Sequence, residues 1–465
     1  MGDPASRDES RRDVLVVGAG LAGAQVVAEL RAAGFDGRIR VLGAEGVPPY
    51  DRPPLSKHLF DRPTPAWLVG ELGIDLAVLA DEVHLGLPAR GLVLGGDRPA
   101  VRTDTGVVAA DDVILATGAH AVRPPGWEAA LTLHTIADAD RLRDALPPRS
   151  RLVVVGAGWI GAEVATVAAA AGHTVTMVEA AGTPLSAALG ERVGALTVPW
   201  YDEAGVELLT GVLVAAVEPD AVTLADGRTL RADVVLAAVG ARPSTAWLAG
   251  SLPLDPDGSV RIAPTYQVLT PAPITAAEER EVSVADHDAD VTFLGDEVGD
   301  GAGAGVRAGV GVRAGGGGVE ARRPARGLWA VGDVARRWSP RHGLVPGGHW
   351  DGALRGPRVL VGHLLGRPLQ PPDDDPAPYV FSTQLGHDLA MFGVPRGGDV
   401  VLRGDPASGD GWAALWYSGE RVVAIFVVDR PRDVGAARRL FTGPLPPRLD
   451  RAAAADPSLP LRALP

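Results

Sequence analysis

Cysteine is missing from the 465-residue sequence. Disulfide bonds, zinc or iron–sulfur sites with cysteine ligands, and catalysis by a thiol are therefore excluded. Any redox chemistry must come from a bound cofactor.

Lysine is nearly absent, since Lys57 is the only one and arginine supplies the other long basic side chains. Asp and Glu number 57 against 44 Lys and Arg, and the net charge of −13 argues against a general nucleic-acid binder. Apolar runs fall short of a membrane span, and the polar start has no apolar signal-peptide core. We expect a cytoplasmic protein without nucleic-acid or membrane partners. The histidines show no metal-ligand spacing, so no metal site is predicted.

The length and the 46% hydrophobic content predict two to four domains with ample core. Residues 13–30 and 151–168 share one pattern: a β-branched apolar run, a glycine-rich turn and an alanine-rich helical stretch. A second apolar run follows each, at 38–43 and 173–179. This order predicts a Rossmann unit, present twice.

The rest of the chain adds strands, an insertion and a last unit. Further strands are predicted within 112–119, 233–243 and 327–335, and their alternation with helices favours parallel sheets covered by helices. Residues 271–323 are acidic and then rich in Gly and Ala, which predicts a flexible surface insertion, or alternatively a partner-binding segment. After the Pro/Asp-rich residues 368–378, we expect an antiparallel sheet with a helix.

Each glycine-rich turn has the spacing of a dinucleotide-binding site. The first Gly permits the tight turn, the second lets a pyrophosphate approach the backbone, and the third lets the helix pack on the strand. The glycines are Gly18, Gly20 and Gly23 in the first turn, and Gly156, Gly158 and Gly161 in the second.

A carboxylate follows the second strand of each unit. Glu179 lies where a carboxylate accepts hydrogen bonds from an adenosine ribose and repels a 2′-phosphate, which favours NADH over NADPH. Glu45 occupies the comparable place in the first unit.

The motif PPYDRPPLSK at 48–57 resembles the flavin-dependent ferredoxin reductases that serve oxygenases and cytochromes P450, such as the putidaredoxin, rubredoxin and biphenyl-dioxygenase ferredoxin reductases. The similarity continues through nearly the whole chain. It is carried by ATGA at 116–119, GAGWIGAE at 156–163, VGARP at 239–243, VGDVA at 331–335, HWDGAL at 349–354 and PYVFSTQLG at 378–386.

The resemblance implies an α/β fold with two Rossmann-like dinucleotide-binding domains, for FAD and NAD, and a C-terminal α+β domain. The expected FAD domain comprises residues 1–118 and 245–368, with 271–323 as its insertion. The NAD domain would be 119–244 and the C-terminal domain 376–465.

The resemblance also implies site residues. Lys57 would lie near flavin N5 and pair with Glu163, so these two are the catalytic candidates; a cation there favours the anionic reduced flavin. Ala22, Asp333 and Trp350 would contact FAD. Further cofactor contacts are predicted at Arg52, Ala89, Thr117, Gly118, Ile160 and Gly240. The sequence departs from the family pattern at Ala44, His134, Gly348, Phe381 and Thr383.

The implied activity is hydride transfer from NADH to FAD and release of single electrons to a ferredoxin-type iron–sulfur protein, by a monomer or weak homodimer. The missing cysteines favour this over the disulfide reductases of similar architecture. The alternatives are an NADH-binding flavoprotein sensor like apoptosis-inducing factor and a flavin-dependent NADH oxidase. A basic dock for the acidic partner is predicted among Arg322, Arg323, Arg326, Arg336, Arg337 and Arg341.

Overall fold

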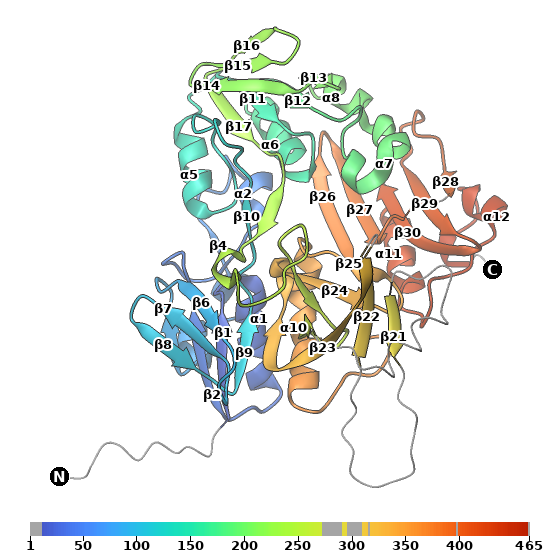
Figure 1. Ribbon diagram of the computed structural model, residues 1–465. Helices are drawn as coiled ribbons and strands as arrows, with labels where there is room; N and C mark the ends of the chain where they lie inside the picture. Colours follow the sequence, from blue (N-terminus) through green and yellow to red (C-terminus); the bar gives the residue numbers. More distant parts are fainter. Residues whose placement is uncertain (1–11, 272–290, 295–308, 315–316, 397–398, 464–465) are drawn as a thin grey trace.

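The computed structural model describes residues 12–271, 291–294, 309–314, 317–396 and 399–463. Its largest sheet is built on five neighbouring parallel strands, whose β-branched side chains are buried as in a sheet covered on both faces. In spatial order they are β5 (Glu82–His84), β2 (Arg38–Leu42), β1 (Asp13–Val17), β9 (Asp112–Leu115) and β23 (Gly317–Ala330). Helices α1 (Leu21–Ala32) and α10 (Trp350–Leu364) pack against each other and share this sheet's core (Figure 1).

Short elements complete this first unit. They are β3 (Tyr50–Asp51), α2 (Pro54–Lys57), β4 (Ala66–Trp67), α3 (Leu68–Glu71), α4 (Leu76–Leu79) and the antiparallel sheet of β6 (Ala89–Val93), β7 (Ala100–Thr103) and β8 (Gly106–Ala109). The large sheet continues beyond β23 through β20 (Gln267–Pro271), β19 (Val260–Ile262), β24 (Ala335–Ser339) and β25 (Gly343–Val345).

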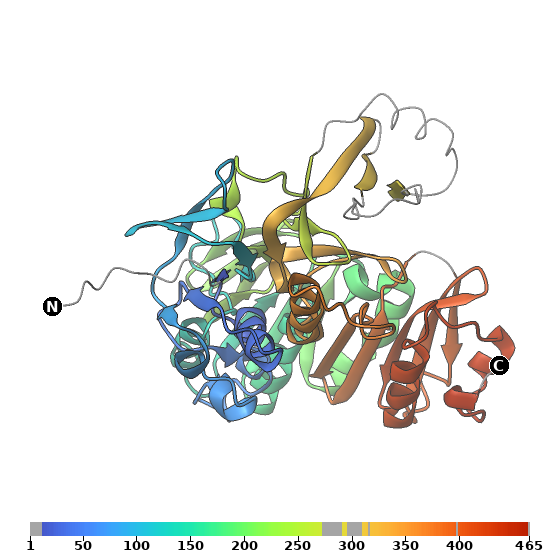
Figure 2. The ribbon, with the colours of Figure 1, turned by 90° about the horizontal axis from the view of Figure 1, so that it is seen from below.

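The predicted insertion contains strands. β21 (Val291–Leu294) pairs with β22 (Gly309–Ala314), and β22 pairs with the first half of β23, so these parts form a ribbon that extends from the body (Figure 2). These strands were not predicted from the sequence, and the expectation that 271–323 is a flexible surface insertion stays a prediction. Residues 272–290 and 295–308 lie outside the described residues.

A second, fully parallel sheet forms the middle of the chain. Its order is β13 (Val206–Thr210), β12 (Thr174–Glu179), β11 (Arg151–Val155) and β17 (Val234–Ala237). Its helices are α5 (Ile136–Asp144), α6 (Trp159–Ala170), α7 (Ser186–Gly194) and α8 (Pro199–Glu203). Strands β14 (Val214–Glu218), β15 (Ala221–Leu224) and β16 (Thr229–Arg231) form a small antiparallel sheet, and β10 (Ala119–Ala121) pairs with β18 (Ala241–Pro243) where the chain enters and leaves this unit.

The last unit is the predicted antiparallel sheet with a helix. Its order is β26 (Tyr379–Gln384), β27 (His387–Gly393), β30 (Arg421–Val428), β29 (Trp412–Ser418) and β28 (Asp399–Arg403). One face packs on the second unit, where Trp412 and Phe426 join the core that contains Leu152 and Val164. Helices α11 (Pro431–Leu440) and α12 (Arg451–Ala455) bring Ala437 and Ala454 to the core on the other face.

The α/β class with two Rossmann-like units and a C-terminal α+β unit is confirmed. Each main sheet draws its strands from one of the predicted domain ranges, while the boundaries themselves stay a prediction. Among the described helices, none has the length and apolar character needed to cross a bilayer.

Candidate functional site

The first glycine turn joins β1 to α1 and has the shape of a phosphate cradle. A Cβ at Gly18, whose φ is +120°, would lie 2.0 Å from the Ala116 carbonyl oxygen, and a Cβ at Gly23 would lie 1.9 Å from that of Gly18. At Gly20, in contrast, no described atom lies within 4 Å of such a Cβ, and no described side chain caps the helix there. Open space at a helix N-terminus with free N–H groups fits a pyrophosphate.

The second turn, between β11 and α6, repeats this geometry. A Cβ at Gly156 would lie 2.4 Å from the Ala238 carbonyl oxygen, and one at Gly161 would lie 2.1 Å from that of Gly156. At Gly158 the described atoms again leave the space within 4 Å open. The residues therefore fit two dinucleotides, one on each parallel sheet.

Asp333 lies beside the first glycine turn. It belongs to the short helix η3 (Gly332–Val334), and a Cβ at Gly332 would lie 2.9 Å from the Ala22 Cβ. Its Oδ1 accepts a hydrogen bond of 3.1 Å from Gly348 N. The fold thus places the segment of Asp333 next to Ala22, although the two are far apart in the sequence.

Trp350 begins α10 and is held by a residue that the sequence analysis did not single out. Its indole Nε1 donates a 2.7 Å hydrogen bond to Oδ1 of Asp51 in β3. Burial raises the pKa of Asp51, against the opposing effect of this hydrogen bond. Asp51 stands inside the PPYDRPPLSK motif, so the motif was its available signal.

Lys57 and Glu163 form a largely buried ion pair. Lys57 Nζ, from α2, donates to Oε1 of Glu163, from α6, and their side chains are 15% and 7% exposed. Oε2 of Glu163 accepts a 2.5 Å hydrogen bond from Ser56 Oγ. The pairing expected from the resemblance is therefore present, while its catalytic role stays a prediction.

Aromatic side chains join the ion pair to Trp350. The Phe381 ring lies 5.5 Å from Lys57 Nζ and meets the Trp350 ring edge-on at 5.7 Å between centroids. Phe381 therefore belongs to the site, where the sequence analysis had noted it only as a departure. Thr383, another departure, points outward and donates to Asp388.

Glu45 and Arg52 lie together at the edge of the first unit. Arg52 pairs with Glu45 and donates to the carbonyl oxygen of His134, and the Tyr50 hydroxyl donates to Glu45 at 2.7 Å. Arg52 thus supplies a guanidinium group beside the position where His134 departs from the family pattern. Burial lowers the pKa of His134, which favours a neutral imidazole.

The remaining predicted contacts lie at strand ends or helix starts. Thr117 and Gly118 follow β9, and Thr117 Oγ1 donates to the Ser244 carbonyl oxygen at 2.9 Å. Ala89 starts β6 and packs against the core of the largest sheet. Ile160 is exposed in the first turn of α6, and Gly240 follows β17. Their contacts with cofactors stay predictions.

Glu179 closes β12 next to the second glycine turn. Its carboxylate accepts backbone N–H groups from Ala157 at 2.6 Å and Ala181 at 2.8 Å. This fixes the carboxylate at the carboxyl edge of the sheet, where the ribose contact is predicted.

The predicted arginine dock is wrong for several members. Arg337 is 6% exposed and pairs with Asp375. Burial alone would raise the pKa of Asp375, but the Arg337 guanidinium holds that pKa below its usual range. Arg322 is also buried, and the side chain of Arg341 is 8% exposed and bound to Asp375. Arg336 pairs with Asp257. These groups neutralise carboxylates of the chain itself, so they offer a partner little free charge.

His342 is a packing residue, since neither ring nitrogen has a hydrogen-bond partner among the described residues and the ring lies 6.1 Å from that of Phe441. Burial lowers its pKa to about 4, with Asp375 raising it and Arg341 lowering it.

Because the pKa of His342 is depressed on folding, the unfolded chain binds more protons between about pH 6.5 and pH 4. The free energy of unfolding should therefore fall as pH drops through this window, by up to about 3 kcal/mol from this group. Urea unfolding at pH 5 and 7.5 should show a smaller pH effect in His342→Leu than in the unsubstituted protein. Equal pH effects would contradict this account.

Two family models match the chain. Residues 12–272 match the pyridine nucleotide-disulphide oxidoreductase model, and residues 379–465 match the reductase C-terminal model. The benzene 1,2-dioxygenase system ferredoxin–NAD(+) reductase subunit of Pseudomonas putida is 31% identical, with 92% of each chain covered.

Solved structures are similar over almost the whole length. The crystal structure of Fdr9 is 35% identical with a TM-score of 0.77, covering 97% of this chain and 99% of that one. The covalent putidaredoxin reductase–putidaredoxin complex is 28% identical with a TM-score of 0.77, covering 97% and 98%. By its two glycine turns, its ion pair and these similarities, the chain belongs to the pyridine nucleotide-disulphide oxidoreductase family.

Proposed function

We propose that the protein is an FAD-dependent reductase that takes hydride from NADH and passes single electrons to a ferredoxin-type iron–sulfur protein serving an oxygenase or cytochrome P450. The observation that carries the proposal is the pair of open glycine cradles at Gly20 and Gly158, with the Lys57–Glu163 pair joining α2 of the first unit to α6, the helix of the second cradle. When bound, a flavin accepts a hydride and donates electrons one at a time.

The chain's own residues would bind and orient. The N-termini of α1 and α6 would face the two pyrophosphates, and Asp333 would hold a ribityl hydroxyl. Lys57 supplies positive charge where negative charge develops on reduction, and Glu163 offsets the burial of that ammonium. The chain has no cysteine, so the two-thiol chemistry of disulfide reductases has no place in it.

Anaerobic mixing with NADH tests this function. The purified protein should be yellow, NADH should bleach it, and an added ferredoxin should restore the colour and support cytochrome c reduction. A colourless protein after incubation with FAD would refute the flavoprotein. Bleaching that ferredoxin does not reverse would favour the sensor. In a separate aerobic assay, oxygen uptake without ferredoxin would favour the oxidase.

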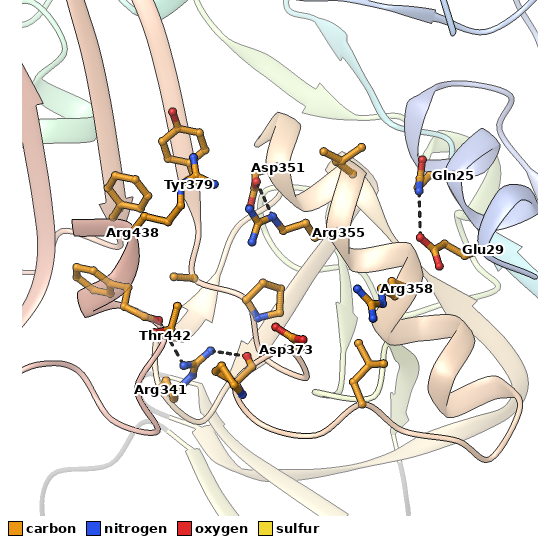
Figure 3. Close-up of a pocket in the computed structure, with 17 residues that line it drawn as sticks. Gln25, Glu29, Arg341, Asp351, Arg355, Arg358, Asp373, Tyr379, Arg438 and Thr442 are labelled. Carbon is orange, nitrogen blue, oxygen red and sulfur yellow. Dashed lines mark hydrogen bonds and ion pairs between the residues drawn. The ribbon is translucent and has the colours of Figure 1, made fainter. Parts of the chain in front are cut away.

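A different surface replaces the arginine dock. A pocket of about 330 Å³ opens between α1, α10 and the C-terminal unit (Figure 3). The exposed Arg358 on its wall has no ion-pair or hydrogen-bond partner among the described residues. Arg438 lies over the Tyr379 ring at 4.7 Å and forms no ion pair among the described residues, although its charge opposes the burial that raises the pKa of Asp351. Arg355 pairs with Asp351 at 2.9 Å but stays 47% exposed. Carboxylates of an acidic partner would complement these guanidinium groups.

The same pocket leads to the ion pair through aromatic rings. Tyr379 lines the pocket and stacks on Phe381 at 5.8 Å, and Phe381 contacts both Trp350 and Lys57. Only the rings of Tyr379 and Phe381 would therefore separate a partner docked here from the proposed flavin site.

Charge reversal on the pocket wall tests the surface. Arg358→Glu and Arg438→Glu together should raise the KM for ferredoxin about tenfold or more at low salt, because attraction becomes repulsion, and high salt should shrink the difference. NADH–ferricyanide reduction should not change. Ferredoxin-dependent cytochrome c reduction at several salt concentrations measures this.

Arg438→Glu alone should raise this KM in the same direction, and its matched control is Arg439→Glu, which makes the same single charge reversal on α11 outside the pocket lining. An equal rise in KM from Arg439→Glu would contradict docking at this pocket.

We also propose a cytoplasmic location, where NADH is available as reductant, and cell fractionation tests it.

A further inference from the structure

The C-terminal unit places side chains against the Lys57–Glu163 pair. Ser382 Oγ, from β26, donates a 2.5 Å hydrogen bond to Oε1 of Glu163, the oxygen that also accepts from Lys57. Because β26 is the edge strand of its sheet, its residues can meet α6 directly. Nothing in the glycine turns or in the PPYDRPPLSK motif predicted this contact.

Gln384 sets the direction of that hydrogen bond. Its Nε2 lies 3.2 Å from Ser382 Oγ, two residues along the same strand face, and an amide nitrogen can only donate. The Ser382 oxygen accepts from Gln384, so its proton is left for Glu163. Ser382 and Gln384 are 2% and 1% exposed, so water does not compete for these groups.

We propose that Ser382 is a positioning residue for the redox site, acting through Glu163 on Lys57. The relay Gln384–Ser382–Glu163–Lys57 joins all three units of the chain, with Ser56 fixing the other carboxylate oxygen. The proposal rests on the flavin function proposed above and extends it, because it assigns the C-terminal unit a part in setting the charge beside the flavin site.

The relay governs how much negative charge Glu163 shows to its surroundings. Ser382 and Lys57 share one carboxylate oxygen, so loss of the Ser382 hydroxyl leaves the carboxylate less neutralised and the ammonium drawn more strongly to it. Both changes oppose the gain of negative charge on reduction. We expect a lower midpoint potential of bound flavin and about tenfold slower reduction at saturating NADH, with the KM for NADH unchanged.

The variants Ser382→Val and Ser382→Thr isolate the hydroxyl, since valine and threonine have nearly the same shape. Ser382→Thr keeps the donor and should restore the potential and the rate, whereas Ser382→Val should show both losses. Ser382→Ala repeats the test without an added methyl group, in case the buried site rejects the larger side chain.

The matched control is Thr166→Val. Thr166 Oγ1 accepts a 2.7 Å hydrogen bond from Leu385 N at the same contact of α6 and β26, one helical turn from Glu163. Its loss weakens the contact without touching the relay, so the flavin potential should stay that of the unsubstituted protein.

Redox titration with dye indicators and stopped-flow reduction measure the outcome. A lowered potential in Ser382→Val and Ser382→Ala with recovery in Ser382→Thr supports the relay. Equal potentials in all variants, or the same fall in Thr166→Val, would overturn it. A protein without bound flavin before any substitution would refute the proposed function instead, so the two failures are distinguishable.

Discussion

Replacing Lys57 with methionine is expected to slow the reduction of bound flavin by NADH about 100-fold, equivalent to roughly 3 kcal/mol of transition-state stabilisation. The Glu163 carboxylate would then be buried with hydroxyl donors but no cation, and its charge would oppose the electrons arriving from NADH. Stopped-flow bleaching at saturating NADH measures the loss. Lys57→Arg should recover only part of the rate, because a planar guanidinium cannot occupy the place of a compact ammonium.

A double substitution separates the charge from the fold. Lys57→Met with Glu163→Gln removes both charges, so it should unfold at a higher urea concentration than Lys57→Met alone. Its flavin reduction should remain slow, since the cation is still missing. Recovery of the full rate in the double variant would show that Lys57 only balances Glu163.

Valine at Gly20 and at Gly158 should separate the two cofactor sites. Each glycine has an extended backbone conformation that valine tolerates, and the described atoms leave room for the side chain. The side chain would fill the space proposed for a pyrophosphate. Gly20→Val should therefore fold but lose FAD, whereas Gly158→Val should stay yellow while its Kd for NADH rises about 100-fold.

Flavin absorbance after gel filtration and titration with NADH measure these outcomes. Gly161→Ala is the contrasting variant, because its Cβ would meet the Gly156 carbonyl oxygen and destabilise the turn itself. If Gly158→Val lost flavin and Gly20→Val lost only NADH, the assignment of the two units would be reversed.

Most of the fold could be predicted from local sequence patterns. The glycine turns, their flanking strands and the antiparallel last unit were predictable because each is a short-range feature of apolar period and turn residues. The ribbon of β21 and β22 was not. The VTFL run of β21 is only four residues long within an acidic stretch, and the Gly-rich sequence of β22 looks irregular whether or not it pairs with a neighbouring strand.

The site was predictable only where the family resemblance gave its residues a role. Lys57 and Glu163 came from motifs, but Ser382 and Phe381 reach them from a segment more than two hundred positions along the chain, and no local period marks such a meeting. The buried members of the predicted arginine dock were wrong for a different reason, since closeness in sequence says nothing of burial. Alternation along β24 turns Arg337 inward beside Ser339, toward Asp375.

The apolar layer shared by the middle unit and the C-terminal sheet has a consequence for engineering. Trp412 and Phe426 pack with residues of the middle unit. The last unit produced alone would therefore expose a large aromatic surface to solvent. Chimaeras between relatives would have to exchange both sides of this apolar interface together. On heating, the middle unit and the C-terminal sheet should unfold in one cooperative transition.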